Sequence, residues 1–187
     1  MEGSHIPFES RAAPVKEQNI QGISPLETAC LRAKAKALAS LEEETLCLGC
    51  DQTLSFEGGS FSKAQSLQEA EEQLSKLQGK THHLHSAYAL AVLLEGKPLL
   101  LKLAARSLPM AMKAMDSGAR GAYLATQEWQ GSLGAYRIEG KGAQLFPPFS
   151  LENREIIMGL PLRELLFFLK SLGIHPAIKA PWSLSFA

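Results

Sequence analysis

Residues 24–51 read SPLETACLRAKAKALASLEEETLCLGCD, and this stretch predicts a helix followed directly by a buried strand. The segment Ser24–Glu27 is a strong helix start, because a serine cap, a proline at the first helical position and a glutamate three residues after the serine form a capping box. The alanines, leucines and lysines that follow favour a helix to about Ser40. The apolar run from Thr45 to Cys50 then predicts a strand that stops at Asp51.

Outward from this stretch, helices and strands alternate along the chain. A second capping box at Ser66–Glu69 opens a helix that ends before Gly79. The other expected elements are strands at 81–94 and 99–105 joined as a hairpin, short helices at 111–115 and 119–127, a helix at 161–172 and an irregular tail over 174–187. The pattern predicts an α/β protein, with a mixed sheet flanked by helices, in a single domain over residues 1–187.

The charge balance and the apolar content of the chain exclude some classes of protein. The 187 residues carry 19 Lys plus Arg against 19 Asp plus Glu, so the formal net charge is zero. This balance argues against a broad basic surface for nucleic acid, and any charged ligand must be held by a few placed residues. No run approaches the ~20 apolar residues of a membrane-spanning helix, and the N-terminus has no signal-peptide core. We therefore expect a cytoplasmic protein with no nucleic-acid or membrane partner.

Two clusters suggest metal or redox chemistry, and both are better explained as structure. Cys47 and Cys50 form a CxxC, but no second ligand pair accompanies them, so buried strand cysteines are favoured. Of the three histidines in Thr81–His85, only His83 and His85 share a face of a strand. Two ligands do not close a zinc site, so a polar strand edge is favoured.

The position that the helix and strand pattern indicates as a candidate for chemistry is Asp51. A carboxylate directly after a buried strand sits where open α/β sheets place their ligands, and it can hold a divalent metal or orient a water. A helix cap or loop acid is an equally good reading of the position. Lys36 and Lys63 can each pair with a phosphate, although a lysine alone is more often solvated surface. Glu17 is an ordinary loop acid on its own.

Taken together, seven segments resemble the Maf family of septum-formation-inhibitor-like nucleoside triphosphate pyrophosphatases. The resemblance covers residues 6–173 and implies a Maf/ITPase-like fold. The segments occur in the family's order. They are Glu17 after Ala13–Lys16, Ala33–Ala37, Gly49–Gln52, Phe61–Lys63, Leu77–His82, Gly134–Gly140 and Gly159–Leu162.

The resemblance implies hydrolysis of a nucleoside triphosphate between its α and β phosphates. It implies Asp51 as the general base and as a ligand of Mg²⁺ or Mn²⁺, with Glu17 as a second acid near the metal. Lys36 and Lys63 would face the triphosphate. Phosphoryl chemistry of this kind depends on charge neutralisation and a positioned water.

Two positions resemble the subgroup of the family that acts on 7-methyl-GTP. Gln52 follows Asp51 where other members have threonine, and Glu139 stands where they have glutamine. A glutamate can accept hydrogen bonds from the donor pair on a guanine edge. Gln52 and Glu139 are therefore predicted to contact the substrate.

The chain departs from the family at its start. The family's first strand and its Ser-x-Ser-x-x-Arg loop are not present in the 187 residues, and Ala64 replaces the proline that usually follows Lys63. The N-terminal strand is therefore expected to be missing. The alternative function is a non-catalytic Maf-like protein that binds nucleotides or partners, with a role in division control. Family members are often dimers, so a homodimer is possible.

Overall fold

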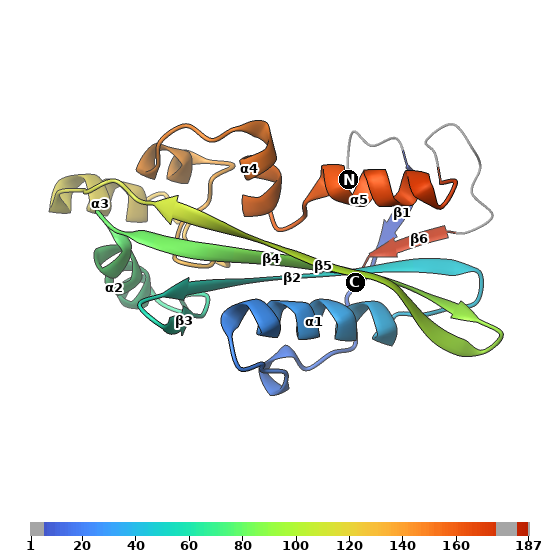
Figure 1. Cartoon of the computed structure of the whole chain (residues 1–187). Helices are drawn as coiled ribbons and strands as arrows, with labels where there is room; N and C mark the ends of the chain where they lie inside the picture. Colours follow the sequence, from blue (N-terminus) through green and yellow to red (C-terminus); the bar gives the residue numbers. More distant parts are fainter. Residues whose placement is uncertain (1–5, 175–182, 187) are drawn as a thin grey trace. The chain divides into compact units, whose positions relative to one another are not determined.

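The computed structural model describes residues 6–174 and 183–186, which belong to two compact units (Figure 1). The first unit comprises residues 1–52, 86–106 and 159–187, and the second comprises 53–85 and 107–158. The elements in chain order are β1 (Phe8–Ser10), a 3₁₀ helix (Glu17–Asn19), α1 (Pro25–Ala39), β2 (Thr45–Phe56), β3 (Gly59–Phe61), α2 (Leu67–Leu77), β4 (Thr81–Leu94), β5 (Lys97–Ala111), α3 (Ser117–Leu124), a second 3₁₀ helix (Lys141–Leu145), α4 (Leu151–Ile157), α5 (Leu162–Ser171) and β6 (Ser183–Phe186).

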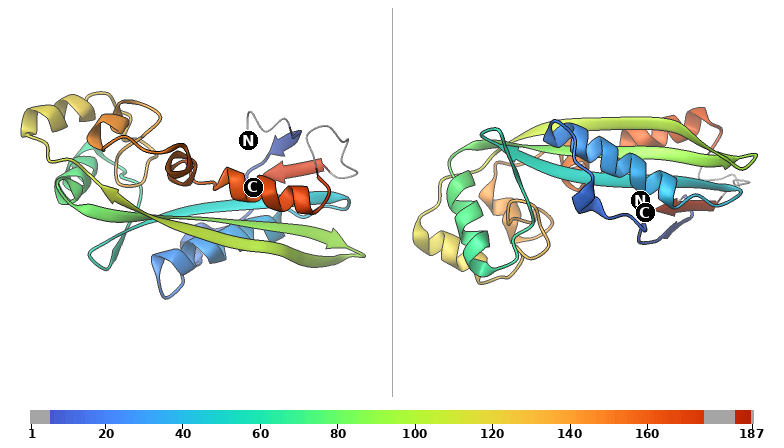
Figure 2. Two further views of the ribbon diagram at one scale, coloured as in Figure 1. Left: turned by 45° about the horizontal axis from the view of Figure 1, so that its top comes forward. Right: turned by 90° about the horizontal axis from the view of Figure 1, so that it is seen from below.

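The mixed sheet has the strand order β1-β6-β2-β4-β5, and β3 pairs with β2. In the first unit β6 is parallel to both of its neighbours: Ser183–Phe186 pairs with Thr45–Leu48 of β2, and Leu184–Phe186 pairs with Phe8–Ser10 of β1. Figure 2 shows β1 and β6 side by side in two views. A segment near the C-terminus of the chain therefore holds an interior position of the sheet.

The predicted irregular tail is wrong for Ser183–Phe186. These residues alternate polar and apolar side chains with the period of a strand, and the prolines before them obscured this short signal. The parts of that prediction on 175–182 and 187 lie outside the described residues.

In the first unit, α1 covers one face of the sheet and α5 covers the other (Figure 1). The α1 interface is made of small residues, since Ala29, Ala33 and Ala37 are fully buried with alanines of β4. On the other face, Leu165 and Leu169 of α5 pack with larger side chains of β2 and β4. The helix with alanines can therefore approach the sheet more closely.

The second unit has its own core, built around α2, α3 and the aromatic residues that follow α3. The turn Glu57–Gly58 joins β2 to β3, and both residues have positive φ (49° and 79°), as a two-residue hairpin turn requires. Helix α2 begins at the predicted cap, because Ser66 Oγ accepts from Glu69 N at 3.1 Å.

The predicted helices at 25–40, 67–77 and 161–172 and the hairpin are confirmed, and two local predictions are wrong. Residues 111–115 do not form a helix: β5 continues to Ala111, and residues 112–115 belong to no helix or strand. Strand β2 does not stop at Asp51 but runs on to Phe56. Three consecutive polar residues, Asp51–Thr53, hide this continuation, because they interrupt the apolar run. The single domain over residues 1–187 stays a prediction.

Candidate functional site

The ammonium of Lys36 joins two carboxylates in the first unit. Its Nζ lies 2.8 Å from Asp51 Oδ1 and 2.9 Å from Glu17 Oε1, and it donates to the Cys50 carbonyl at 3.0 Å. The three contacts match the three donors of an ammonium group. Three residues predicted to form the site are thus brought together by α1, β2 and the first 3₁₀ helix.

The close approach of α1 to β2 depends on Gly49. A Cβ built on Gly49 would lie 2.2 Å from the Ala33 carbonyl oxygen and 2.4 Å from Ala37 N, both in the backbone of α1. No side chain fits there, so only glycine allows this packing. Lys36 lies between the two alanines, and the short helix-to-strand distance brings its Nζ to Asp51.

Burial and the ion pair have opposite effects on the pKa of each group. The Asp51 side chain is only 5% exposed, and burial raises its pKa although the Lys36 ammonium opposes the rise. Burial would lower the pKa of Lys36, but hydrogen bonds to Asp51 and Glu17 outweigh it, so the net shift is upward. The pair is therefore a lysine held in its charged form beside a carboxylate of increased basicity.

One oxygen of the site has no partner. Asp51 Oδ2 is buried and accepts no hydrogen bond from the residues that the structure describes. Buried carboxylate oxygens without a donor are costly, and such an atom in a native fold calls for a missing ligand or water. This oxygen is the atom of the site that can accept a proton or bind a cation.

Asp51 itself lies inside β2, so the expectation that it directly follows the strand is wrong. Because side chains alternate along a strand, Asp51 and Gln52 project to opposite faces. Gln52 Nε2 donates to Ser86 Oγ at 2.8 Å, and the structure does not add Gln52 to the Lys36 cluster.

Arg32 is a member of the site that the sequence analysis missed. Its Nε donates to the Ile20 carbonyl at 3.0 Å, next to the 3₁₀ helix that carries Glu17, and its charge lowers the pKa of Asp51. The signal was present, since Arg32 and Lys36 are four residues apart and share a face of α1.

Lys63 and Glu139 belong to the second unit and are exposed. Lys63 follows β3, and its carbonyl accepts from Gln65 Nε2 at 2.9 Å. Glu139 lies in a loop. The buried residues Tyr136 and Ile138 precede it in this loop, and the second 3₁₀ helix follows it. The sequence indicated Lys63 as a residue that can pair with a phosphate, whereas Glu139 was indicated through the resemblance alone.

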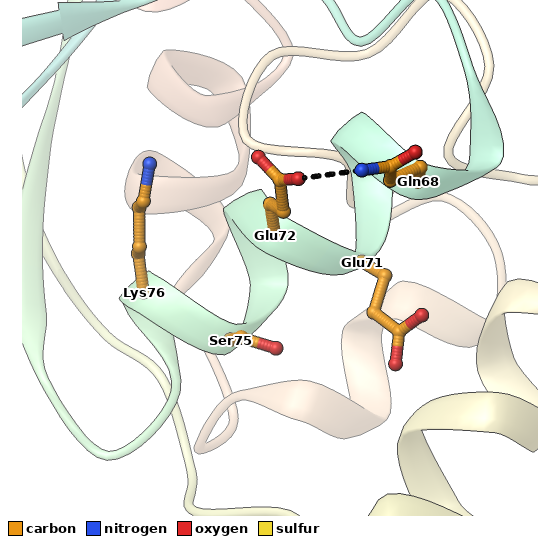
Figure 3. A pocket seen from close by; sticks show the side chains of 5 residues that line it. All are labelled: Gln68, Glu71, Glu72, Ser75 and Lys76. Carbon is orange, nitrogen blue, oxygen red and sulfur yellow. Dashed lines mark hydrogen bonds between the residues drawn. The ribbon is translucent and has the colours of Figure 1, made fainter.

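A shallow hollow lies on the surface of α2 in the second unit (Figure 3). It is lined by Gln68, Glu71, Glu72, Ser75 and Lys76, all from this one helix, and Gln68 Nε2 donates to Glu72 across it at 3.2 Å. Its residues are those of an ordinary solvated helix face, and none of the predicted site residues lines it.

The cysteines are structural, as the sequence predicted. Cys47 and Cys50 are thiols in β2, where a spacing of three points them to opposite faces, and Cys47 Sγ donates to the Ser40 carbonyl at 3.0 Å. Burial raises the pKa of Cys50 to about 12, which keeps the thiol protonated and unreactive. Within the described residues, no group of three or more His, Cys, Asp or Glu side chains could hold a metal ion.

The histidines do not lie at a strand edge, because β4 is an interior strand between β2 and β5. In the second unit, His82 is fully buried with its Nε2 2.7 Å from the Tyr136 hydroxyl. His85 on the opposite face has Ser55 Oγ and Ser107 Oγ at 2.8 and 2.7 Å. Both are therefore cross-strand and core hydrogen-bonding residues.

Burial of His82 predicts acid sensitivity. Burial, with a smaller contribution from His83, lowers the pKa of His82 from 6.5 to about 4. The unfolded chain takes up the proton first, so stability is full above pH 6.5 and falls as the pH drops towards 4. We expect this residue to lower the free energy of unfolding by about 2 kcal/mol between pH 7 and pH 5. Denaturant unfolding of His82→Gln should lose that part of the drop, whereas the exposed-residue control His83→Gln should keep it. Equal drops in both variants would contradict the assignment.

The sequence of this chain is similar to one family model and to several known enzymes. A family model described as "Maf-like protein" matches residues 1–172. The chain is 34% identical over 176 residues to a 7-methyl-GTP pyrophosphatase of Brucella abortus biovar 1 (strain 9-941), covering 89% of this chain and 86% of the relative. It is 39% identical over 155 residues to a 7-methyl-GTP pyrophosphatase of Bartonella quintana (strain Toulouse), with 81% and 76% covered. It is 34% identical over 178 residues to a nucleoside triphosphate pyrophosphatase of Rhodopseudomonas palustris (strain BisB18), with 91% and 86% covered.

Proposed function

Because this chain belongs to the family of Maf-like proteins, we propose that it is a nucleoside triphosphate pyrophosphatase that acts on 7-methyl-GTP or a similar modified nucleotide. The products are the nucleoside monophosphate and pyrophosphate. The observation that carries the proposal is the partly buried Lys36–Asp51 pair with the unpartnered Asp51 Oδ2. The names of the relatives support the substrate class.

Asp51 acts as the general base. Lys36 fixes Oδ1 at 2.8 Å, which leaves Oδ2 to take a proton from water. The water oxygen forms a new bond to phosphorus, the anhydride bond between the α and β phosphates breaks, and pyrophosphate leaves. A carboxylate whose pKa is raised by burial is a better proton acceptor than an exposed one.

Lys36 neutralises charge on the triphosphate by exchanging one partner. Its side chain is 13% exposed and Glu17 is 48% exposed, while Asp51 and the Cys50 carbonyl are fixed in β2. Glu17 is therefore the partner that a phosphate oxygen replaces. The exchange would free the Glu17 carboxylate close to the bound phosphates.

The donor set fits a divalent cation. Asp51 Oδ2 and the Glu17 carboxylate are hard oxygen ligands, and Mg²⁺ is commonly bound by one or two carboxylates together with substrate phosphates. We propose that Asp51 and Glu17 hold Mg²⁺ or Mn²⁺. When bound, the ion would neutralise negative charge on the phosphates.

Glu139 is proposed to read the base. Methylation of guanine at N7 makes the base cationic and leaves its N1–H and exocyclic amine as donors, so a carboxylate is the complementary partner. Gln52 and Lys63 stay predicted substrate contacts, and Gln52 Nε2 already donates one hydrogen bond to Ser86.

A pyrophosphate-release assay tests the function. We expect release from 7-methyl-GTP to exceed that from the four common ribonucleoside triphosphates and dTTP, to vanish in EDTA, and to return with Mg²⁺ or Mn²⁺. Thermal stabilisation by nucleotides without release would instead identify a non-catalytic nucleotide-binding protein. No release and no stabilisation with any nucleotide would overturn the proposal.

The cellular location and the partners of the protein are proposals as well. Within the described residues, none of the helices has the length and apolar character needed to cross a membrane. A cytoplasmic location, the lack of a nucleic-acid partner and a homodimer stay predictions from the sequence.

A further inference from the structure

The 136–142 loop of the second unit is anchored by two buried residues and carries two exposed side chains. Tyr136 and Ile138 are buried, whereas Arg137 and Glu139 alternate with them and are exposed. Gly140 N donates to the Arg137 carbonyl at 3.3 Å, which closes a turn with Glu139 at its tip. The Glu139 carboxylate makes no hydrogen bond or ion pair with other residues in the described part of the chain.

Close backbone contact fixes the two ends of this loop against each other. A Cβ built on Gly142 would lie 2.4 Å from the Arg137 carbonyl oxygen and 2.6 Å from Arg137 N. Arg137 N in turn donates to the Tyr123 hydroxyl at 3.1 Å. The backbone on the first side of Glu139 is therefore held by a buried tyrosine at the end of α3.

The backbone on the other side of Glu139 is held by Glu128. Glu128 Oε2 accepts from Lys141 N at 2.6 Å and from Gly142 N at 3.4 Å. The same oxygen would lie 2.4 Å from a Cβ on Gly140, so the carboxylate rests directly on the loop backbone. Gly140 has no side chain with which to cap the 3₁₀ helix that follows, and Glu128 supplies the missing acceptor from another segment.

We infer that Glu128 is a positioning residue that holds the 136–142 loop in the conformation in which Glu139 reads the base of the substrate. The inference rests on the proposed function, since it concerns the substrate preference of that enzyme. Charge-assisted hydrogen bonds from a carboxylate to backbone N–H groups are stronger than neutral ones. When its backbone is held in place, Glu139 loses less conformational entropy on binding the nucleobase. The preference for the correct nucleobase therefore depends on Glu128.

The test measures kcat/KM for 7-methyl-GTP and for UTP in Glu128→Ala. We expect the ratio of the two values to fall about tenfold, the effect of losing roughly one charged hydrogen bond, while kcat/KM for UTP changes less than about twofold. Glu128→Gln keeps an acceptor oxygen and should restore part of the ratio. Gln130→Ala, at an exposed position on the same segment, is the matched control and should leave the ratio unchanged.

A double-mutant cycle separates positioning from simple stabilisation. If Glu128 acts through Glu139, adding Glu128→Ala to Glu139→Gln should not lower the ratio further. Equal losses for both nucleotides, or independent effects of the two substitutions on the ratio, would overturn the inference and leave the proposed function standing. A wild-type chain that hydrolyses neither nucleotide would overturn both.

Discussion

Asp51→Asn is expected to lower pyrophosphate release about 10³-fold, within the range that general bases contribute to catalysis. The substitution changes one atom. The amide oxygen can still accept from Lys36, whose Nζ lies 2.8 Å from Oδ1 in the wild-type chain. The amide nitrogen replaces the unpartnered Oδ2 and can neither accept a proton nor bind a cation.

The fold should survive this change. Lys36 keeps its contacts with Glu17 and the Cys50 carbonyl, so its charge is not left unpaired. We expect the midpoint of thermal unfolding to move by no more than about 4 °C. Glu43→Gln, an exposed acid of the same unit, is the control and should retain the full rate. A rate for Asp51→Asn within threefold of the wild type would exclude Asp51 as the base.

Gly49→Ala should produce the largest loss of stability among single-methyl substitutions in the first unit. The added Cβ would meet the Ala33 carbonyl oxygen at 2.2 Å and Ala37 N at 2.4 Å. Both atoms belong to the backbone of α1, so no side-chain rotation can relieve the overlap and the whole helix must move. Overpacking of this kind costs about 3 kcal/mol, which corresponds to a fall of roughly 10 °C in the unfolding midpoint.

The control for this prediction is Gly121→Ala in α3. A Cβ on Gly121 has no atom within 4 Å, and alanine favours a helix over glycine by about 1 kcal/mol, so this variant should be neutral or slightly more stable. Denaturant unfolding of the two variants measures the difference. The displaced helix should also separate Lys36 from Asp51. The rate of pyrophosphate release per folded molecule should therefore fall as well. Equal stability of both variants would contradict the packing argument.

Local signals in the sequence predicted the helices well. The start of α1 is set by Ser24 Oγ, which accepts from Glu27 N at 3.1 Å, and residues three apart can be recognised without a structure. The grouping of Lys36 with Asp51 and Glu17 could not be derived in this way, because it joins residues 15 and more positions apart through the packing of α1 on β2. Resemblance to a family indicated the residues, and the tertiary structure supplied their contacts.

Other features had no local signal. Nothing around Gly49 marks it as the contact point of a helix, since its backbone is not in a glycine-only conformation and its role is to leave space. The same holds for Glu128, whose hydrogen bonds reach Lys141 and Gly142 from a distant segment. Asp51 was misplaced at the end of a strand because three consecutive polar residues, Asp51–Thr53, interrupt the apolar run although the strand continues.

The position of β6 has a consequence for the order in which the chain folds. Thr45 pairs with Ser183, 138 positions later, whereas the turn in the second unit joins β2 to β3 through two residues. Long-range pairing of this kind slows folding, because the entropy of closing a long loop is lost before the contacts form. We expect the second unit to acquire protection from hydrogen exchange first. The edge of β2 then stays open to other extended chains until β6 arrives, so newly made protein is most prone to aggregate during that interval.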